Sequence, residues 1–143
     1  MQHERYVGYE IKALSNLLRR RLWGPADHPQ SMLTEIEGVL IGYLCHSQGR
    51  EIYQKDLERA LCIRSSTASR LLKRLEDEGL VQRSMGVRDA RMKRITPTFR
   101  AQALNQEAER RIAATEATLT RGISQEEIDQ FLAIAEKLKQ NLI

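Results

Sequence analysis

Residues 53–80 contain the pattern that most restricts how this chain can fold. A short helical segment, a tight turn and a longer helical segment follow one another between Tyr53 and Leu80. One side of the second segment is apolar at helical spacing and must face a core; it comprises Ala68, Leu71, Leu72 and Leu75. Its other side is polar and basic, which is what a DNA major groove requires of the second helix of such a pair. Gly79 is expected to end that helix as its C′ residue.

The same region contains two linked motifs at a fixed spacing. The first reads Ser-Thr-Ala-Ser-Arg-Leu-Leu-Lys-Arg-Leu-Glu over residues 66–76 and continues as Glu-Gly-Leu-Val over residues 78–81. The second reads Asp-Ala-Arg-Met-Lys-Arg-Ile over residues 89–95. Together they resemble the winged helix-turn-helix of MarR-type bacterial transcription regulators, the second motif being similar to the Asp-x-Arg wing signature of that family. Two motifs at this spacing are far more specific than a helix-turn-helix alone.

The resemblance extends over nearly the whole chain and implies a mainly α fold. That fold is a winged helix-turn-helix with a small antiparallel β wing, plus N- and C-terminal dimerisation helices. We expect a single regulator domain over residues 1–143, in which residues 33–97 form the DNA-binding winged helix. Residues 1–24 and 98–143 would then supply the dimerisation helices. The partners implied are a second copy of the chain, as a homodimer, and double-stranded DNA with a pseudo-palindromic operator.

Apolar periodicity and capping residues predict the remaining elements. Residues 4–22 carry an apolar stripe at helical spacing, which indicates an N-terminal helix that needs a partner surface. Wing strands are expected over residues 81–84 and 92–96, and a long helix over residues 99–121. Pro97 should end the second strand, because proline donates no ladder hydrogen bond. Three helix starts are expected: capping boxes at Thr34 with Glu37 and at Ser124 with Glu127, and an N-cap at Thr98.

Two positions depart from the pattern of the family. The N-cap of the first helix of the pair is usually Ser or Thr in the family, whereas this chain has Tyr53, whose side chain is not a capping group. The usual glycine of the turn is replaced by Cys62. If the turn keeps a left-handed conformation, Cys62 carries strain of roughly 1 kcal/mol.

Charge is concentrated where DNA would bind. The formal net charge is only +4, but residues 64–100 contain ten Lys and Arg against four acids. The rest of the chain contains thirteen basic against fifteen acidic residues. A basic centre between nearly neutral flanks suits a polyanion-binding module, although it equally suits a solvated surface. The wing motif decides between these two interpretations.

Several functional classes lack any signature. The chain has no phosphate-binding glycine loop, no HExxH, no CxxC and no nucleophile elbow, so we expect no enzyme activity, no catalytic residues and no cofactor. His3, His28 and His46 lie far apart in sequence and make no ligand spacing. A metal held by His46, Cys45 and distant acids is the alternative to an ordinary helix-end cation at His46, and we expect no metal. No apolar run approaches the roughly 20 residues of a membrane span, and no signal peptide is visible, so a cytoplasmic protein is expected.

We expect the DNA contacts to come from the second helix and the wing. The hydroxyl residues at the helix start suit phosphates, and Arg70 and Lys73 can read guanine edges or hold phosphates. Arg74 is expected to contact a phosphate. By resemblance, Arg91 enters the minor groove and Asp89 steers it. The full set of predicted DNA-binding residues is Ser65, Ser66, Thr67, Ser69, Arg70, Lys73, Arg74, Asp89, Arg91 and Lys93.

The sequence indicates less clearly which signal controls the protein, and several alternatives stay open. Relatives often bind small aromatic or phenolic ligands, for which Trp23, Tyr43 and His46 are candidate lining residues, with packing or solvation as the alternative for each. We predict a transcription regulator, most simply a repressor, that responds to a small molecule. One alternative is oxidant sensing through Cys62, because Arg59 and Arg64 lie nearby in sequence and favour a thiolate. Another is a winged helix used for protein contacts without specific DNA binding.

Overall fold

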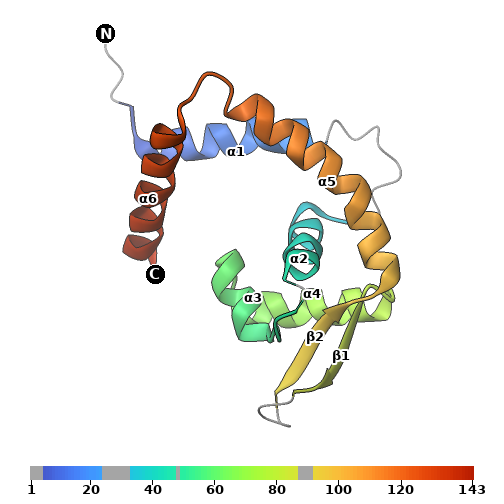
Figure 1. Ribbon diagram of the computed structural model, residues 1–143. Helices are drawn as coiled ribbons and strands as arrows, with labels where there is room; N and C mark the ends of the chain where they lie inside the picture. Colours follow the sequence, from blue (N-terminus) through green and yellow to red (C-terminus); the bar gives the residue numbers. More distant parts are fainter. Residues whose placement is uncertain (1–4, 24–32, 48, 87–91) are drawn as a thin grey trace.

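The computed structural model describes residues 5–23, 33–47, 49–86 and 92–143 (Figure 1). These residues form six helices and two strands in the order expected for a winged helix with flanking helices, so the predicted fold class is confirmed. The elements are α1 (Val7–Trp23), α2 (Glu35–His46), α3 (Gln54–Leu61), α4 (Ser65–Asp77), β1 (Val81–Met85), β2 (Lys93–Pro97), α5 (Phe99–Leu119) and α6 (Gln125–Leu142).

The core lies between α2, α3, α4 and the two strands. Leu72 and Leu75 of α4 and Leu57 of α3 are fully buried, and all three pack against α2 and the start of the wing. Burying a leucine side chain contributes roughly 1.5–3 kcal/mol, so this cluster is the main stabilising element of the domain. Its full membership is Leu40, Ile41, Leu44, Ile52, Leu57, Leu71, Leu72, Leu75, Leu80, Val81, Ile95 and Ala101.

The wing is a two-stranded antiparallel sheet in which Val81 pairs with Pro97 and Met85 with Lys93. Pro97 is the last residue of β2, as the missing N–H of proline predicts. The chain before α3 runs beside β2, where the Ile95 N–H donates to the Ile52 carbonyl at 2.8 Å. Ile95 is buried in the core, so this sheet is fixed to the helices on one face.

Side-chain caps start three helices, with one difference from expectation. Ser124 and Glu127 form the predicted capping box of α6, at 3.1 and 3.0 Å. Thr34 accepts from the Glu37 N–H at 3.4 Å, but Glu37 does not return the bond. The predicted capping box of α2 is therefore only half formed, because the Glu37 side chain turns inward to another partner. Thr98 caps α5 by accepting from the Ala101 N–H at 3.3 Å.

The end of α4 and the start of α5 are joined by three hydrogen bonds. The Thr98 hydroxyl donates to the Gly79 carbonyl at 2.8 Å, and the Thr98 N–H donates to the Leu80 carbonyl at 3.1 Å. The Arg100 guanidinium donates to the Glu78 carbonyl at 2.7 Å. Gly79 has a φ of 72°, which is the left-handed C′ conformation predicted for it. We call this set of contacts the α4–α5 joint.

The flanking helices expose much of their apolar surface. Figure 1 shows α1 beside α5, and α6 standing away from the winged helix. No residue of α6 is buried, and its Phe131 and Leu132 are 61% and 58% exposed. Further large apolar residues are exposed on α1 and α5: Tyr9, Ile11, Leu14, Leu17, Leu104, Ile112 and Leu119. None of the described helices is both long enough and apolar enough to cross a membrane.

Cys62 occupies the turn between α3 and α4 in the left-handed conformation, with φ 53° and ψ 47°. It is the one non-glycine residue with positive φ in the described part of the chain. An L side chain is disfavoured in this region because its Cβ crowds the following carbonyl oxygen. The conformation that the sequence suggested for Cys62 is therefore present.

We predict that Cys62→Gly stabilises the fold by roughly 0.5–1 kcal/mol, because glycine adopts this backbone conformation without a Cβ clash. The free energy of unfolding from urea titration is the measurement. Cys62→Ala is the matched control, since it removes the thiol but keeps the Cβ. An equal gain from both variants would place the cost in the thiol rather than in the backbone.

Candidate nucleic-acid interface

The second helix of the pair, α4, separates its residues into two faces. Ala68, Leu71, Leu72 and Leu75 are buried on the inner face. The outer face carries the predicted DNA-binding residues, of which Ser65, Ser66, Ser69, Arg70 and Lys73 are exposed and Thr67 is half-buried. No side chain caps the α4 N-terminus at Arg64, so the first N–H groups of the helix remain available to an anion.

Besides its packing in the core, α3 supports the start of α4 through hydrogen bonds of Gln54. The Gln54 amide donates to the Ser69 hydroxyl oxygen at 3.0 Å and to the Ser65 carbonyl at 3.3 Å. Ser69 keeps its own hydroxyl hydrogen for a further acceptor. Sequence reasoning did not single out Gln54, because a polar residue in the first turn of a helix looks the same whether it faces solvent or a neighbouring helix.

The predicted phosphate contact Arg74 lies on the flank of α4 that faces α2. Its Nη1 is 3.0 Å from Oε1 of Glu37, and its side chain is 50% exposed. On the opposite flank, Arg83 of β1 lies 3.6 Å from Glu76 of α4. The two ion pairs fix α4 against α2 and against the wing. The assignment of Arg74 to DNA remains a prediction, but its charge already has a partner.

Of the three predicted DNA-binding residues of the wing, only Lys93 lies among the described residues. Lys93 is exposed at the first position of β2, paired with Met85. Asp89 and Arg91 fall within residues 87–91, outside the described residues, so their predicted roles are untested. The strands that carry this segment are fixed at its base, where the Gly86 N–H donates to the Met92 carbonyl at 2.9 Å. Gly86 therefore lies at the base of the wing loop.

A hollow of about 400 Å³ separates α3 from the wing on the side of the α4 N-terminus. Three cations, Lys55, Arg83 and Lys93, stand at this hollow beside one acid, Glu58. The positive excess continues the basic character of α4 into the wing, which is the field expected at a polyanion interface. The remaining lining residues are Tyr53, Gln54, Ser65, Met92 and Ile95.

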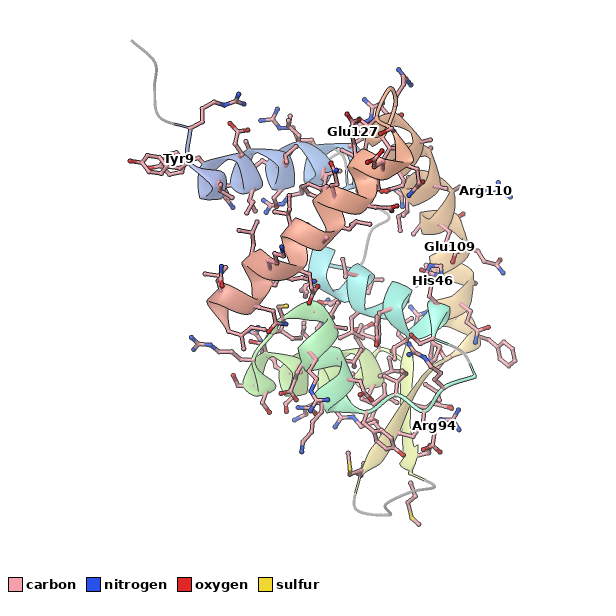
Figure 2. All side chains as sticks on the ribbon, turned by 60° about the vertical axis from the view of Figure 1, so that its left-hand side comes forward. Tyr9, His46, Arg94, Glu109, Arg110 and Glu127 are labelled. Atoms are coloured by element: carbon pink, nitrogen blue, oxygen red, sulfur yellow. The ribbon has the colours of Figure 1, made fainter. Side chains whose placement is uncertain are left out.

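Two of the three candidate ligand residues, Tyr43 and His46, lie on α2 in different surroundings. Tyr43 packs against the core from α2, whereas His46 is exposed at the C-terminal end of the same helix. His46 Nε2 lies 3.2 Å from Glu109 Oε1, and Figure 2 shows these two side chains turned toward each other between α2 and α5. The side chain of Trp23 lies outside the described part of the structure. These placements give the predicted ligand site no geometric support among the described residues.

The two cysteines have different surroundings. Cys45 is half-buried next to the core, and burial, together with the nearby Glu109 carboxylate, raises the pKa of its thiol. A raised pKa leaves little thiolate near neutral pH, so Cys45 is poorly suited to react with oxidants. Cys62 is exposed, and its thiol points toward the Arg59 carbonyl at 3.7 Å.

Comparison with known proteins supports the motif and the fold together. The model of the MarR family matches residues 43–93, which span the end of α2, the helix pair and β1 and end at the first residue of β2. The transcription regulator MarR from Oenococcus oeni is 27% identical, with a TM-score of 0.84 over 94% of this chain and 99% of that one. The resemblance to MarR-type regulators inferred from the two motifs is thereby confirmed.

Two structures of MepR from Staphylococcus aureus, each 26% identical, match 99% of this chain and 100% of theirs. The MepR–DNA complex superposes with a TM-score of 0.84, whereas MepR bound to ethidium bromide superposes with 0.57. The arrangement of helices in this chain is therefore closer to the DNA-bound relative than to the ethidium-bound one.

We predict that Gly86→Ala destabilises the fold by about 1–3 kcal/mol, as overpacking does in tight sites. A Cβ at residue 86 would lie 2.7 Å from the Met92 carbonyl oxygen and 2.7 Å from the Tyr53 hydroxyl. The displaced Tyr53 would also lose its 2.6 Å hydrogen bond to Glu51. Urea unfolding is the measurement, and Gly8→Ala is the control, since nothing lies within 4 Å of a Cβ there. An unchanged free energy of unfolding in Gly86→Ala would show that Met92 and Tyr53 can shift to accommodate the added Cβ at little cost.

Proposed function

We propose that this chain, whose centre carries the MarR-family winged helix-turn-helix, is a homodimeric, sequence-specific DNA-binding regulator of transcription. The observation that carries the proposal is the division of α4 into a buried leucine face and an exposed face with Arg70 and Lys73. The wing next to it adds Lys93 and the segment that contains Asp89 and Arg91. MepR, a relative of the same architecture, forms a complex with DNA, which supports the same partner here.

The proposed contacts divide into those that recognise base edges and those that hold the DNA backbone. Arg70 and Lys73 project from the outer face of α4, where side chains reach base edges in the major groove. Ser65, Ser66, Thr67 and Ser69 lie at the start of that helix, where hydroxyls and free N–H groups hold phosphates. We assign Arg91, steered by Asp89, to the minor groove, and Lys93 to the backbone beside it. Such a protein works where the bacterial chromosome lies, in the cytoplasm.

We further propose that the functional unit is a dimer built from residues 1–24 and 98–143. The exposed apolar residues of α1, α5 and α6 support this, because a single copy leaves them in water. A permanent dimer interface buries about 2,000 Å² or more, which these three helices are long enough to supply. The dimer axis then sets the two α4 helices about 34–36 Å apart on a pseudo-palindrome.

Repression relieved by a small molecule is the regulatory mode that we propose. The relative MepR supports it, because its structures include a DNA complex and an ethidium-bound form, which superpose on this chain with TM-scores of 0.84 and 0.57. A ligand that binds the second arrangement better shifts the protein away from DNA. The exposed thiol of Cys62 supports the alternative signal, an oxidant.

The dimer is tested by adding a charge to the apolar stripe of α6. We predict that Phe131→Asp converts a stable dimer into a monomer at micromolar concentration, because a buried unpaired carboxylate is strongly unfavourable. Gln130→Asp adds the same charge at an exposed position about 100° around the helix from Phe131, and should leave the dimer intact. Sedimentation velocity is the measurement. A wild-type monomer at these concentrations would contradict the proposal.

DNA reading is tested with a duplex selected by the wild-type protein from a randomised pool, against a scrambled duplex. Replacing whichever of Arg70 and Lys73 makes a bidentate base contact should cost roughly 1–3 kcal/mol on the selected duplex and much less on the scramble. Arg91→Ala should weaken both similarly and lower the salt slope by about one.

The control is Arg110→Ala, since Arg110 projects from α5 away from the winged helix in Figure 2. This variant should match the wild-type protein on both duplexes. Proportional loss of both duplexes by Arg70→Ala and Lys73→Ala would mean that α4 does not read sequence.

A further inference from the structure

Glu37 is the only ionisable side chain among the described residues that is less than a tenth exposed, at 1%. It lies on α2 and faces the flank of α4. Its Oε1 is 3.0 Å from Nη1 of Arg74, while its Oε2 is buried and accepts no hydrogen bond from the described residues. A buried carboxylate needs a cation, and removal of its partner is strongly unfavourable. The interior of the protein therefore holds Arg74 at this position.

The position of Arg74 on α4 gives this pair its significance. Successive residues of a helix are about 100° apart, so Arg74 lies to one side of Lys73 and of the face that would enter the groove. The guanidinium is nevertheless half exposed, and it stands on the same helix as the DNA-reading residues. An arginine at this position whose charge was not neutralised would contact a nearby DNA phosphate. That contact would strengthen binding to every DNA sequence equally.

We propose that Glu37 is a positioning residue for DNA recognition, which holds and neutralises Arg74 so that α4 carries no extra sequence-independent phosphate contact. The inference rests on the proposed function, specific DNA binding. It assigns discrimination between sequences to Arg70 and Lys73 and gives Arg74 an internal role. It also explains why a buried acid lies beneath a basic interface, where its charge opposes the binding of a polyanion.

The variant that tests this is Glu37→Gln, which keeps the shape of the side chain and removes its charge. The probe is the selected duplex and the scrambled duplex, each titrated at several salt concentrations. With the carboxylate gone, the buried acid no longer neutralises the charge of Arg74, whose half-exposed guanidinium then attracts phosphates more strongly. Binding to the scramble should tighten several-fold, the salt slope should steepen by about one, and the preference for the selected duplex should fall.

Two further variants test whether a change in the salt slope comes from the loss of charge neutralisation at Arg74. In Glu37→Gln/Arg74→Gln no cation is left to release, so the salt slope should return to the wild-type value. Glu35→Gln removes the same charge two residues earlier on α2, at an exposed position whose carboxylate pairs with Arg19 at 2.9 Å, and should leave the slope unchanged. A change in folding stability alone would not move the salt slope, which makes the slope the deciding measurement.

The outcomes distinguish this inference from the function on which it rests. An unchanged or shallower slope in Glu37→Gln overturns the positioning role, even if both duplexes bind more weakly. A shallower slope in Arg74→Gln alone overturns it too, because Arg74 would then contact a phosphate in the wild-type protein. If the wild-type protein enriches no duplex, the proposed function itself fails and the inference falls with it.

Discussion

The winged helix depends on the burial of one face of α4. Leu72 and Leu75 are fully enclosed, and they contact elements from both directions along the chain: α2 and α3 before the helix, and the strands after it. Because a leucine core is close-packed, α4 cannot roll without opening a cavity. That restraint keeps the opposite, polar face turned to solvent. The geometry of the polar, basic face is therefore a consequence of packing on the opposite side of the helix.

Most of this architecture could be predicted from local patterns. Helical spacing of apolar residues identified the inner face of α4, and the missing N–H of Pro97 predicted the end of β2. Each of these two properties is determined within a few residues, so a single sequence is enough to predict it. The left-handed backbone of Cys62 was suggested by the resemblance, because the family usually has glycine at this turn position.

Tertiary partnerships were beyond such reasoning. Glu37 stands three residues after Thr34, the spacing of a capping box, yet its carboxylate pairs with Arg74, far away in sequence. The support that Gln54 gives to Ser69 escaped prediction for the same reason. The ligand candidates Tyr43 and His46 lie on one helix, and sequence spacing alone did not tell that one packs inward while the other pairs with Glu109.

The α4–α5 joint has a mechanical consequence. Its three hydrogen bonds connect residues 78–80, which directly follow α4, to Thr98 and Arg100 at the start of α5, with Thr98 contributing two of them. A hinge needs backbone that changes its torsion angles at low cost, and these bonds occupy the groups that would have to move. A tilt of the far end of α5 would therefore be transmitted to the winged helix instead of being absorbed at the joint. Because α5 is 21 residues long, a small change of angle at the joint corresponds to a large displacement at its other end.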